Sequence, residues 1–64
     1  MRFINIDRVI EMTGKSRSAI YRDMNAGKFV KQVPRGVRSV AWVEQEVLDW
    51  MADRIKERDA VNNV

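Results

Sequence analysis

The sequence predicts a small α+β fold that is mostly helical, in the order helix, turn, helix, β-hairpin, helix. Within residues 1–27, two neighbouring stretches place apolar side chains at helical spacing, and each ends at a glycine. After Gly27 the pattern changes to β-branched and aromatic residues around a turn, and helical spacing returns at Glu44. The 64 residues suit one domain, residues 1–64, near the lower size limit for unaided folding.

The first helix is expected over residues 6–13. Asn5 is a good N-cap because its side-chain oxygen can accept from the free N–H groups of the first turn. Asp7 suits the positive end of the helix dipole. Gly14 is expected to end the helix, since glycine adopts the left-handed backbone conformation without a Cβ penalty.

Ser16 is the next good N-cap, and a second helix is expected from Arg17 to about Ala26, ended by Gly27. Two short helices joined in this way form a helix-turn-helix. The string GKS at 14–16 also resembles the end of the phosphate-binding loop of nucleotide hydrolases. That motif needs a glycine five positions earlier, where this chain has valine, so we reject nucleotide binding.

A two-stranded hairpin is expected from residues 29–33 and 39–43, with PRGVR between them as the turn. A third helix is expected over residues 44–59, followed by a frayed tail at 60–64. Trp42 and Trp50 are assigned to the core. The complete order is that of a winged helix-turn-helix, in which the hairpin is the wing.

The composition favours a cytoplasmic protein that is not an enzyme. The chain has no cysteine and no histidine, which removes disulfides, thiolate ligands and the usual general base. No apolar run is long enough to span a membrane. The carboxylate pairs Asp7 with Glu11 and Asp49 with Asp53 are expected to be solvated surface. We therefore expect no catalytic residue, metal, cofactor or small-molecule ligand.

The charge is unevenly distributed along the chain. Residues 15–38 hold seven basic side chains and one acidic side chain, whereas residues 39–64 hold three basic and six acidic ones. A basic middle beside an acidic end indicates an oriented molecule with one face for a polyanion.

Two stretches, TGKSRSAIYRDMNAGKFVKQV and RSVAWVEQEVLDWM, resemble the AlpA family of small prophage regulators, which is related to phage excisionases and to MerR-type DNA-binding domains. The matching positions run in order over most of residues 3–52. Val30 departs from the resemblance, because the family usually has proline there, and so does Lys15, because an apolar residue is common after the turn glycine. The resemblance implies a regulator of a prophage or integrated element that either activates an integrase gene or acts at attachment sites to favour excision.

In a helix-turn-helix, the second helix enters the major groove of DNA. Ile20 and Met24 are expected to face the core, which turns Arg22 outward, where its guanidinium can read guanine. A simple ion pair with an acidic neighbour is the alternative for Arg22, and packing is the alternative for Tyr21. Asp23 is expected to be solvated surface, and solvated surface is also the interpretation that stands against a DNA contact by Asn25. The predicted DNA-binding residues of the helix are Ser16, Arg17, Ser18, Tyr21, Arg22 and Asn25.

Lysines of the turn and of the connection to the wing are placed to reach phosphates, and the two arginines of the wing tip suit a minor groove or the adjacent backbone. A plain exposed turn is the alternative for the wing tip. The predicted contacts from these segments are Lys15, Lys28, Lys31, Arg35 and Arg38.

Together these features predict a sequence-specific regulator that binds double-stranded DNA. Further copies of the chain, an integrase or RNA polymerase are the partners expected to add specificity, because one small domain touches few base pairs. The alternative is a protein-interaction module, whose basic surface or acidic third helix docks a partner protein.

Overall fold

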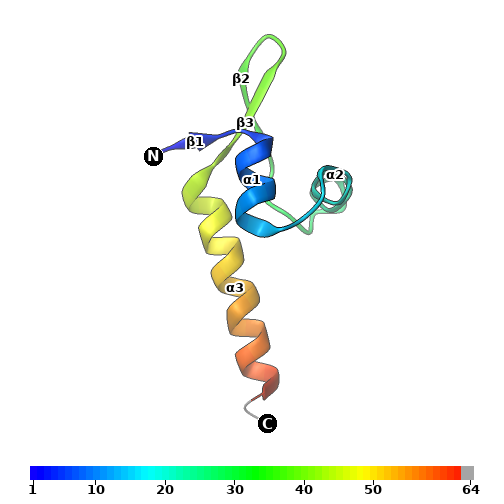
Figure 1. Cartoon of the computed structure of the whole chain (residues 1–64), viewed down its shortest axis with the longest axis vertical. Helices are drawn as coiled ribbons and strands as arrows, with labels where there is room; N and C mark the ends of the chain where they lie inside the picture. Colours follow the sequence, from blue (N-terminus) through cyan, green and yellow to red (C-terminus); the bar gives the residue numbers. More distant parts are fainter. Residues whose placement is uncertain (63–64) are drawn as a thin grey trace.

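The computed structural model describes residues 1–62 as three helices and a three-stranded antiparallel sheet (Figure 1). This confirms the mostly helical α+β fold of winged-helix type. The elements in chain order are β1 (Phe3–Ile4), α1 (Ile6–Thr13), α2 (Arg17–Asn25), β2 (Val33–Gly36), β3 (Ser39–Val43) and α3 (Glu44–Asn62).

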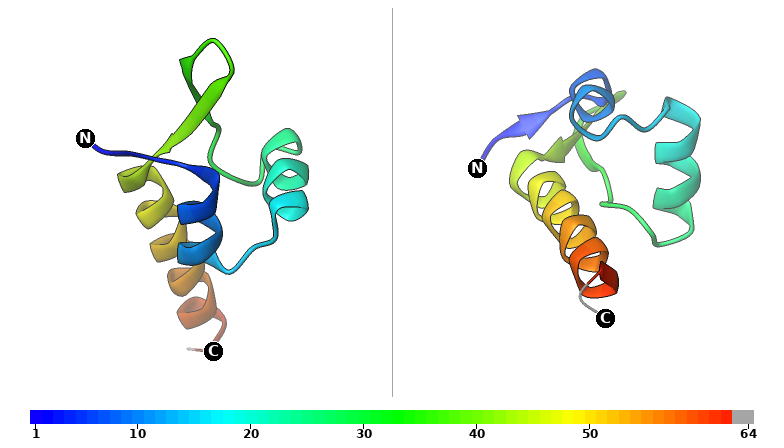
Figure 2. Two further views of the ribbon diagram at one scale, coloured as in Figure 1. Left: turned by 45° about the horizontal axis from the view of Figure 1, so that its top comes forward. Right: turned by 60° about the horizontal axis from the view of Figure 1, so that its bottom comes forward.

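The helix-turn-helix has the predicted caps. Asn5 accepts the backbone N–H of Arg8 at 3.0 Å and so begins α1, and Gly14 ends it with a φ of 74°. Ser16 accepts the backbone N–H of Ala19 at 3.1 Å and begins α2. Figure 2 shows how the short connection turns the chain from α1 into α2.

The sheet contains a strand that the sequence did not reveal. Its order is β1-β3-β2, and β1 pairs with the end of β3 through Phe3 opposite Val43 and Ile4 opposite Trp42. A strand of two residues is too short to show the alternating pattern by which strands are identified. Its effect is to tie the N-terminal end of the chain to the beginning of α3, where the N–H of Glu44 donates to the carbonyl of Arg2 at 2.8 Å.

The first strand of the wing lies later than predicted. Residues 29–33 were expected to form it, but β2 runs over Val33–Gly36, and the turn is residues 37–38. Phe29 is instead buried in the core, so residues 28–32 are a connection rather than a strand. Pro34 is tolerated in β2 because β2 is an edge strand, and an edge strand does not need every N–H for pairing.

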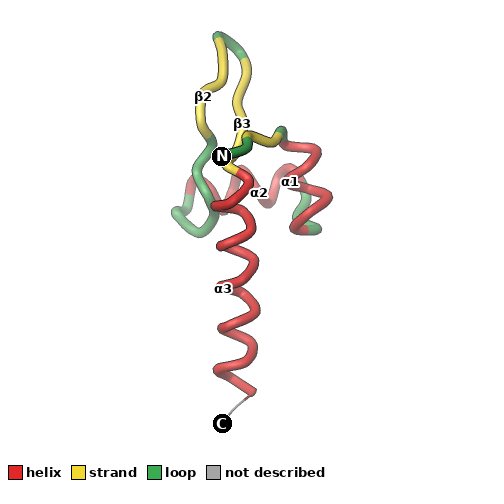
Figure 3. Tube along the Cα trace, turned by 90° about the vertical axis from the view of Figure 1, so that its left-hand side faces the viewer, coloured by secondary structure: helices red, strands yellow, loops and turns green. Residues whose placement is uncertain are grey.

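The third helix is longer than expected. It continues to Asn62, so the frayed tail predicted from residue 60 is wrong for residues 60–62, and residues 63–64 lie outside the described part of the chain. Figures 1 and 3 show the second half of α3 extending away from the rest of the molecule, and every side chain in residues 52–61 is exposed.

A single small core joins the sheet to the helices. Trp42 is fully buried, and its indole N–H donates to the carbonyl of Val30 at 3.1 Å. Trp50, which was also assigned to the core, lies half-buried at its margin. Its ring meets that of Phe29 edge-on, with 4.9 Å between the two ring centroids. The buried core cluster is Ile4, Val9, Ile20, Phe29, Trp42 and Val47.

A partly buried ion pair holds the turn between α1 and α2. The ammonium of Lys15 lies 2.5 Å from a carboxylate oxygen of Asp23, and their side chains are only 20% and 16% exposed. The prediction that Asp23 is solvated surface is therefore wrong. Two hydrogen bonds to the carboxylate lower the pKa of Asp23 from 3.8 to about 2, and the bond from Lys15 has a larger effect than the bond from Arg22.

Replacing Trp42 with alanine is expected to abolish cooperative folding. The change leaves a cavity and an unpaired carbonyl at Val30, and truncation of a buried tryptophan costs about 3–5 kcal/mol, which is most of the stability of a small domain. Urea unfolding followed by circular dichroism measures the loss. Val37→Ala, at a fully exposed turn position, is the matched control and should unfold like the natural chain. A loss below about 1 kcal/mol for Trp42→Ala would contradict this description of the core.

The lowered pKa of Asp23 also sets a pH dependence. A carboxyl whose pKa is lower in the folded state stabilises that state above its unfolded pKa, here 3.8, and the contribution is lost as pH falls through about 2. Asp23→Asn removes this group. We expect the Tm of the natural chain to exceed that of the variant at pH 5, and the difference to shrink steadily between pH 4 and 2. A difference that is independent of pH would show that the carboxylate charge does not stabilise the turn.

Candidate nucleic-acid interface

One face of α2 is turned outward as predicted. Ile20 is fully buried and Met24 packs against the core, so the opposite face of the helix is open to solvent. The exposed residues on this helix include Arg17, Ser18, Arg22 and Asn25. Ser16, which precedes the helix, is exposed as well, so five of the six predicted residues are exposed and Tyr21 is the exception.

Arg22 is both paired and accessible. Its Nε donates to a carboxylate oxygen of Asp23 at 3.1 Å, yet its side chain remains 74% exposed. Within residues 1–62 the terminal nitrogens of its guanidinium make no other hydrogen bond or ion pair. The two alternatives for Arg22 are therefore compatible, because the pair with Asp23 leaves the outer edge of the guanidinium free.

The beginning of α2 carries a second accessible cation. Arg17 lies 3.5 Å from a carboxylate oxygen of Asp7, and both side chains are more than half exposed. Such a surface pair is worth only about 0–1 kcal/mol, so a phosphate can displace it. Ser16 acts as the N-cap of the helix, so one lone pair of its hydroxyl oxygen is used within the fold while its O–H can still donate.

Two side chains predicted to contact DNA interact instead with other residues of the protein. Lys15 is paired with Asp23, and its ammonium lies 5.7 Å from the centre of the Phe29 ring and 5.3 Å from that of Trp50. Tyr21 is half-buried, with its ring edge-on to Trp42 at 6.3 Å between centroids. Both side chains therefore have packing roles in the structure.

The wing presents two exposed guanidinium groups. The β2–β3 ladder pairs Pro34 with Val40 and Gly36 with Ser39, so Arg35 is the extra residue of a bulge. Bulges redirect side chains away from the regular ladder. Arg38 lies in the two-residue turn. Both arginines are exposed at the end of the hairpin that projects at the top of Figure 1.

The connection between α2 and the wing carries the remaining two lysines. The carbonyl of Lys28 accepts the indole N–H of Trp50 at 3.2 Å, which anchors the backbone while the residue stays exposed. Lys31 is also exposed. The fold thus brings five predicted cations to α2, the connection and the wing, namely Arg17, Arg22, Lys28, Arg35 and Arg38, and places Lys31 beside a groove.

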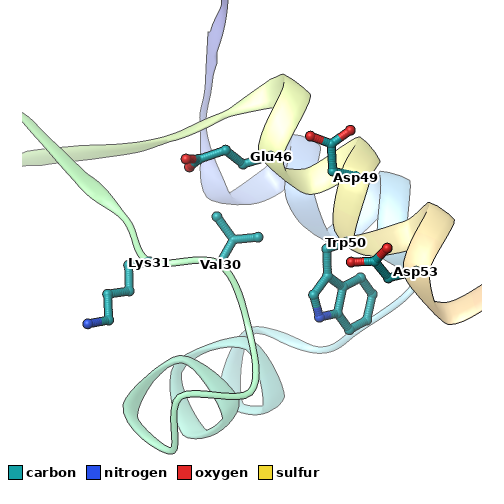
Figure 4. Close-up of a pocket in the computed structure, with 6 residues that line it drawn as sticks. All are labelled: Val30, Lys31, Glu46, Asp49, Trp50 and Asp53. Atoms are coloured by element: carbon teal, nitrogen blue, oxygen red, sulfur yellow. The ribbon is translucent and has the colours of Figure 1, made fainter.

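That groove is lined by more acidic than basic side chains, in contrast to the exposed arginines of α2 and the wing. It has a volume of about 470 Å³ and lies between the connection and α3. Figure 4 shows Glu46, Asp49 and Asp53 along α3, Trp50 reaching toward the connection, and Lys31 pointing away from the carboxylates. Three carboxylates repel phosphate, so the acidic side of the molecule does not belong to a surface for polyanions.

The sequence interpretation missed the role of Asp23. It is the single acidic residue within residues 15–38, and it lies eight residues after Lys15, on the far side of a predicted turn. An isolated acidic residue in a basic segment was the available signal that it pairs with its neighbours.

Among residues 1–62, no group of His, Cys, Asp and Glu side chains is placed to hold a metal ion. None of the helices in this part of the chain is both long and apolar enough to cross a bilayer.

Two relatives share most of this chain. One is an uncharacterized protein, ORF88, of Enterobacteria phage P4, which is 44% identical over 57 residues. The match covers 89% of this chain and 65% of the phage protein, so the chain spans less than two thirds of that relative. The other is the DNA-binding transcriptional activator AlpA of Escherichia coli (strain K12), 34% identical over 62 residues, with 88% of this chain and 89% of that protein covered. No solved structure matches the chain.

The family model of the prophage CP4-57 regulatory protein (AlpA) matches residues 2–55. This range contains α1, α2, the whole wing and the part of α3 that packs on the core. The chain therefore belongs to the AlpA family of prophage regulatory proteins.

Proposed function

We propose that this protein is a sequence-specific regulator of transcription that binds double-stranded DNA, in the setting of a prophage or integrated element. One observation carries the proposal most strongly. The exposed face of α2 and the wing tip carry unburied arginines, while the carboxylates of α3 line a separate groove. The relative from Escherichia coli is named as a DNA-binding activator, which supports the same conclusion.

In this proposal, α2 lies in the major groove and Arg22 reads a guanine through the outer nitrogens of its guanidinium. Ser18 and Asn25 contact neighbouring base edges, and Arg17 binds phosphate near the beginning of the helix. Ser16 and Tyr21 lie at the margin of this surface. Arg35 and Arg38 reach the flanking backbone or minor groove, and Lys28 and Lys31 add phosphate contacts.

The protein acts without a catalytic residue, metal or cofactor in this proposal, and it works in the cytoplasm. One domain of this size covers few base pairs, so useful specificity requires further copies on the DNA, an integrase or RNA polymerase. The alternative role in this setting, implied by the resemblance of the family to phage excisionases, is action at attachment sites to favour excision.

Selection of bound duplexes from a random oligonucleotide pool tests the proposal directly. We expect a short enriched motif, and we expect the affinity for it to fall by orders of magnitude between 50 and 200 mM salt. No enriched motif, with a weak salt dependence, would instead favour the protein-interaction module. An interface with an apolar centre depends less on salt.

Arg22→Ala is expected to cost about 1–3 kcal/mol on the selected site and to remove the preference at one base position. The reason is that a bidentate arginine contact discriminates among bases, whereas phosphate contacts do not. Arg58→Ala is the matched control, because it removes the same charge from the end of α3 that extends away from α2 (Figure 1). Competition assays with single-base variants of the site measure both proteins. Equal weakening on every sequence would mean that Arg22 binds a phosphate.

Replacing both Arg35 and Arg38 with alanine is expected to weaken all sites alike. The slope of log affinity against log salt should fall by about one unit for each lost phosphate contact, while the selected bases stay the same. The matched control is Lys56→Ala with Arg58→Ala, which removes two charges from exposed positions on α3. An unchanged slope in the wing variant would show that the tip does not touch DNA.

A further inference from the structure

Asp23 joins the turn to the outward face of α2. Its two carboxylate oxygens serve different cations: one lies 2.5 Å from the ammonium of Lys15, and the other accepts from Nε of Arg22 at 3.1 Å. The Asp23 side chain is only 16% exposed, although it neighbours an arginine that is 74% exposed. A partly buried carboxylate therefore holds Nε of a guanidinium whose terminal nitrogens face solvent.

The contact with Arg22 has a defined chemical consequence. A guanidinium has five N–H donors in a rigid planar fork. When Nε is committed to a carboxylate, the donors that remain are those on the two terminal nitrogens, and the plane of the fork is fixed. Guanine O6 and N7 require such a pair of parallel donors. Asp23 thus restricts the side chain to orientations in which it presents an ordered fork to solvent.

The contact with Lys15 acts in a different way. The Lys15 side chain is only 20% exposed and its ammonium lies over two aromatic rings, so the charge is directed inward and is compensated by Asp23. Lys15 follows the turn glycine, next to the N-cap of α2, where a free ammonium would reach phosphates of any sequence. Pairing it with Asp23 reduces attraction that is independent of sequence.

We propose that Asp23 is a specificity-determining residue of this interface. It positions the guanidinium of Arg22 for a base and withholds the charge of Lys15 from the DNA backbone. The carboxylate itself weakens attraction to phosphate, so it lowers total affinity while it raises discrimination. This inference rests on the proposed function, because it concerns how α2 meets DNA.

The test is Asp23→Asn, measured on the selected site, on a duplex with the Arg22 base changed, and on an unrelated duplex. A bidentate arginine contact supplies about 5- to 140-fold discrimination between bases. The neutral amide of asparagine can hold the guanidinium only through a weaker hydrogen bond, so we expect the variant to lose most of this discrimination. Binding to the unrelated duplex should become tighter, and its salt slope should steepen by up to about one unit, because Lys15 is released. A residue with only a structural role would instead weaken binding to every duplex.

Lys15→Gln is the matched control. It breaks the other ion pair of Asp23 but leaves the carboxylate beside Arg22, so the preference at the Arg22 base should be retained whatever the change in overall affinity. The double variant Arg22→Ala with Asp23→Asn should discriminate no worse than Arg22→Ala alone. Thermal unfolding of each variant establishes that it is folded at the temperature of the assay.

If Asp23→Asn does not fold, Asp23→Glu takes its place. It retains the negative charge beside Lys15, but the extra methylene displaces the carboxylate from its present position against Nε of Arg22, so discrimination should fall without a gain on the unrelated duplex. Full base preference in the folded variant, or equal weakening on all three duplexes, would overturn the inference while the proposed function stands. Absence of DNA binding by the natural chain would overturn the proposed function itself.

Discussion

The burial of Trp42 is the constraint on which the rest of this fold depends. A chain of 64 residues without cysteine has few ways to build a stable core, and this one places a fully buried indole at its centre. Trp42 lies on β3, the central strand, so the same residue faces β1 across the sheet and bonds to the connection that follows α2. The wing and α2 are therefore positioned by one side chain, which makes the relative placement of the two a property of the core.

The two helices of the helix-turn-helix could be predicted because their signals are local. An N-cap and a terminal glycine act within a few residues, and both caps and Gly14 have the geometry that their positions in the sequence indicate. The wing strands could be predicted only roughly, since pattern alone does not say which aromatic residue enters the core. Phe29 was available as a strand residue, but its ring is worth more to the fold when it packs beside Trp50. The short strand β1 depends on pairing with β3, forty residues away along the chain, and no local pattern indicates such a pairing.

The candidate site, like the fold, has a part that could be predicted from the sequence and a part that could not. Charge and helical spacing predicted the outward face of α2 and the cations of the wing, because these properties belong to individual residues. They did not predict which cations are free. Lys15 and Arg22 look equivalent in the sequence, yet one is drawn inward over two rings and the other stays exposed, and the difference comes from a carboxylate shared between them. Such sharing depends on three side chains meeting in space, which is why the role of Asp23 becomes visible only in the structure.

The extension of α3 beyond the core shapes how the molecule moves in water. The body measures 48 by 25 by 19 Å, about twice as long as it is wide, and α3 lies along the longest axis (Figure 1). An elongated particle spins about its long axis faster than it turns end over end. The backbone N–H bonds of α3 point along that axis, as they do in any helix. The relaxation of their nitrogen nuclei therefore reports mainly the slow end-over-end motion. Amides of α2, seen nearly end-on in the same view, sample a different mixture of the two motions. Relaxation rates that differ between these helices would thus reflect molecular shape rather than internal flexibility.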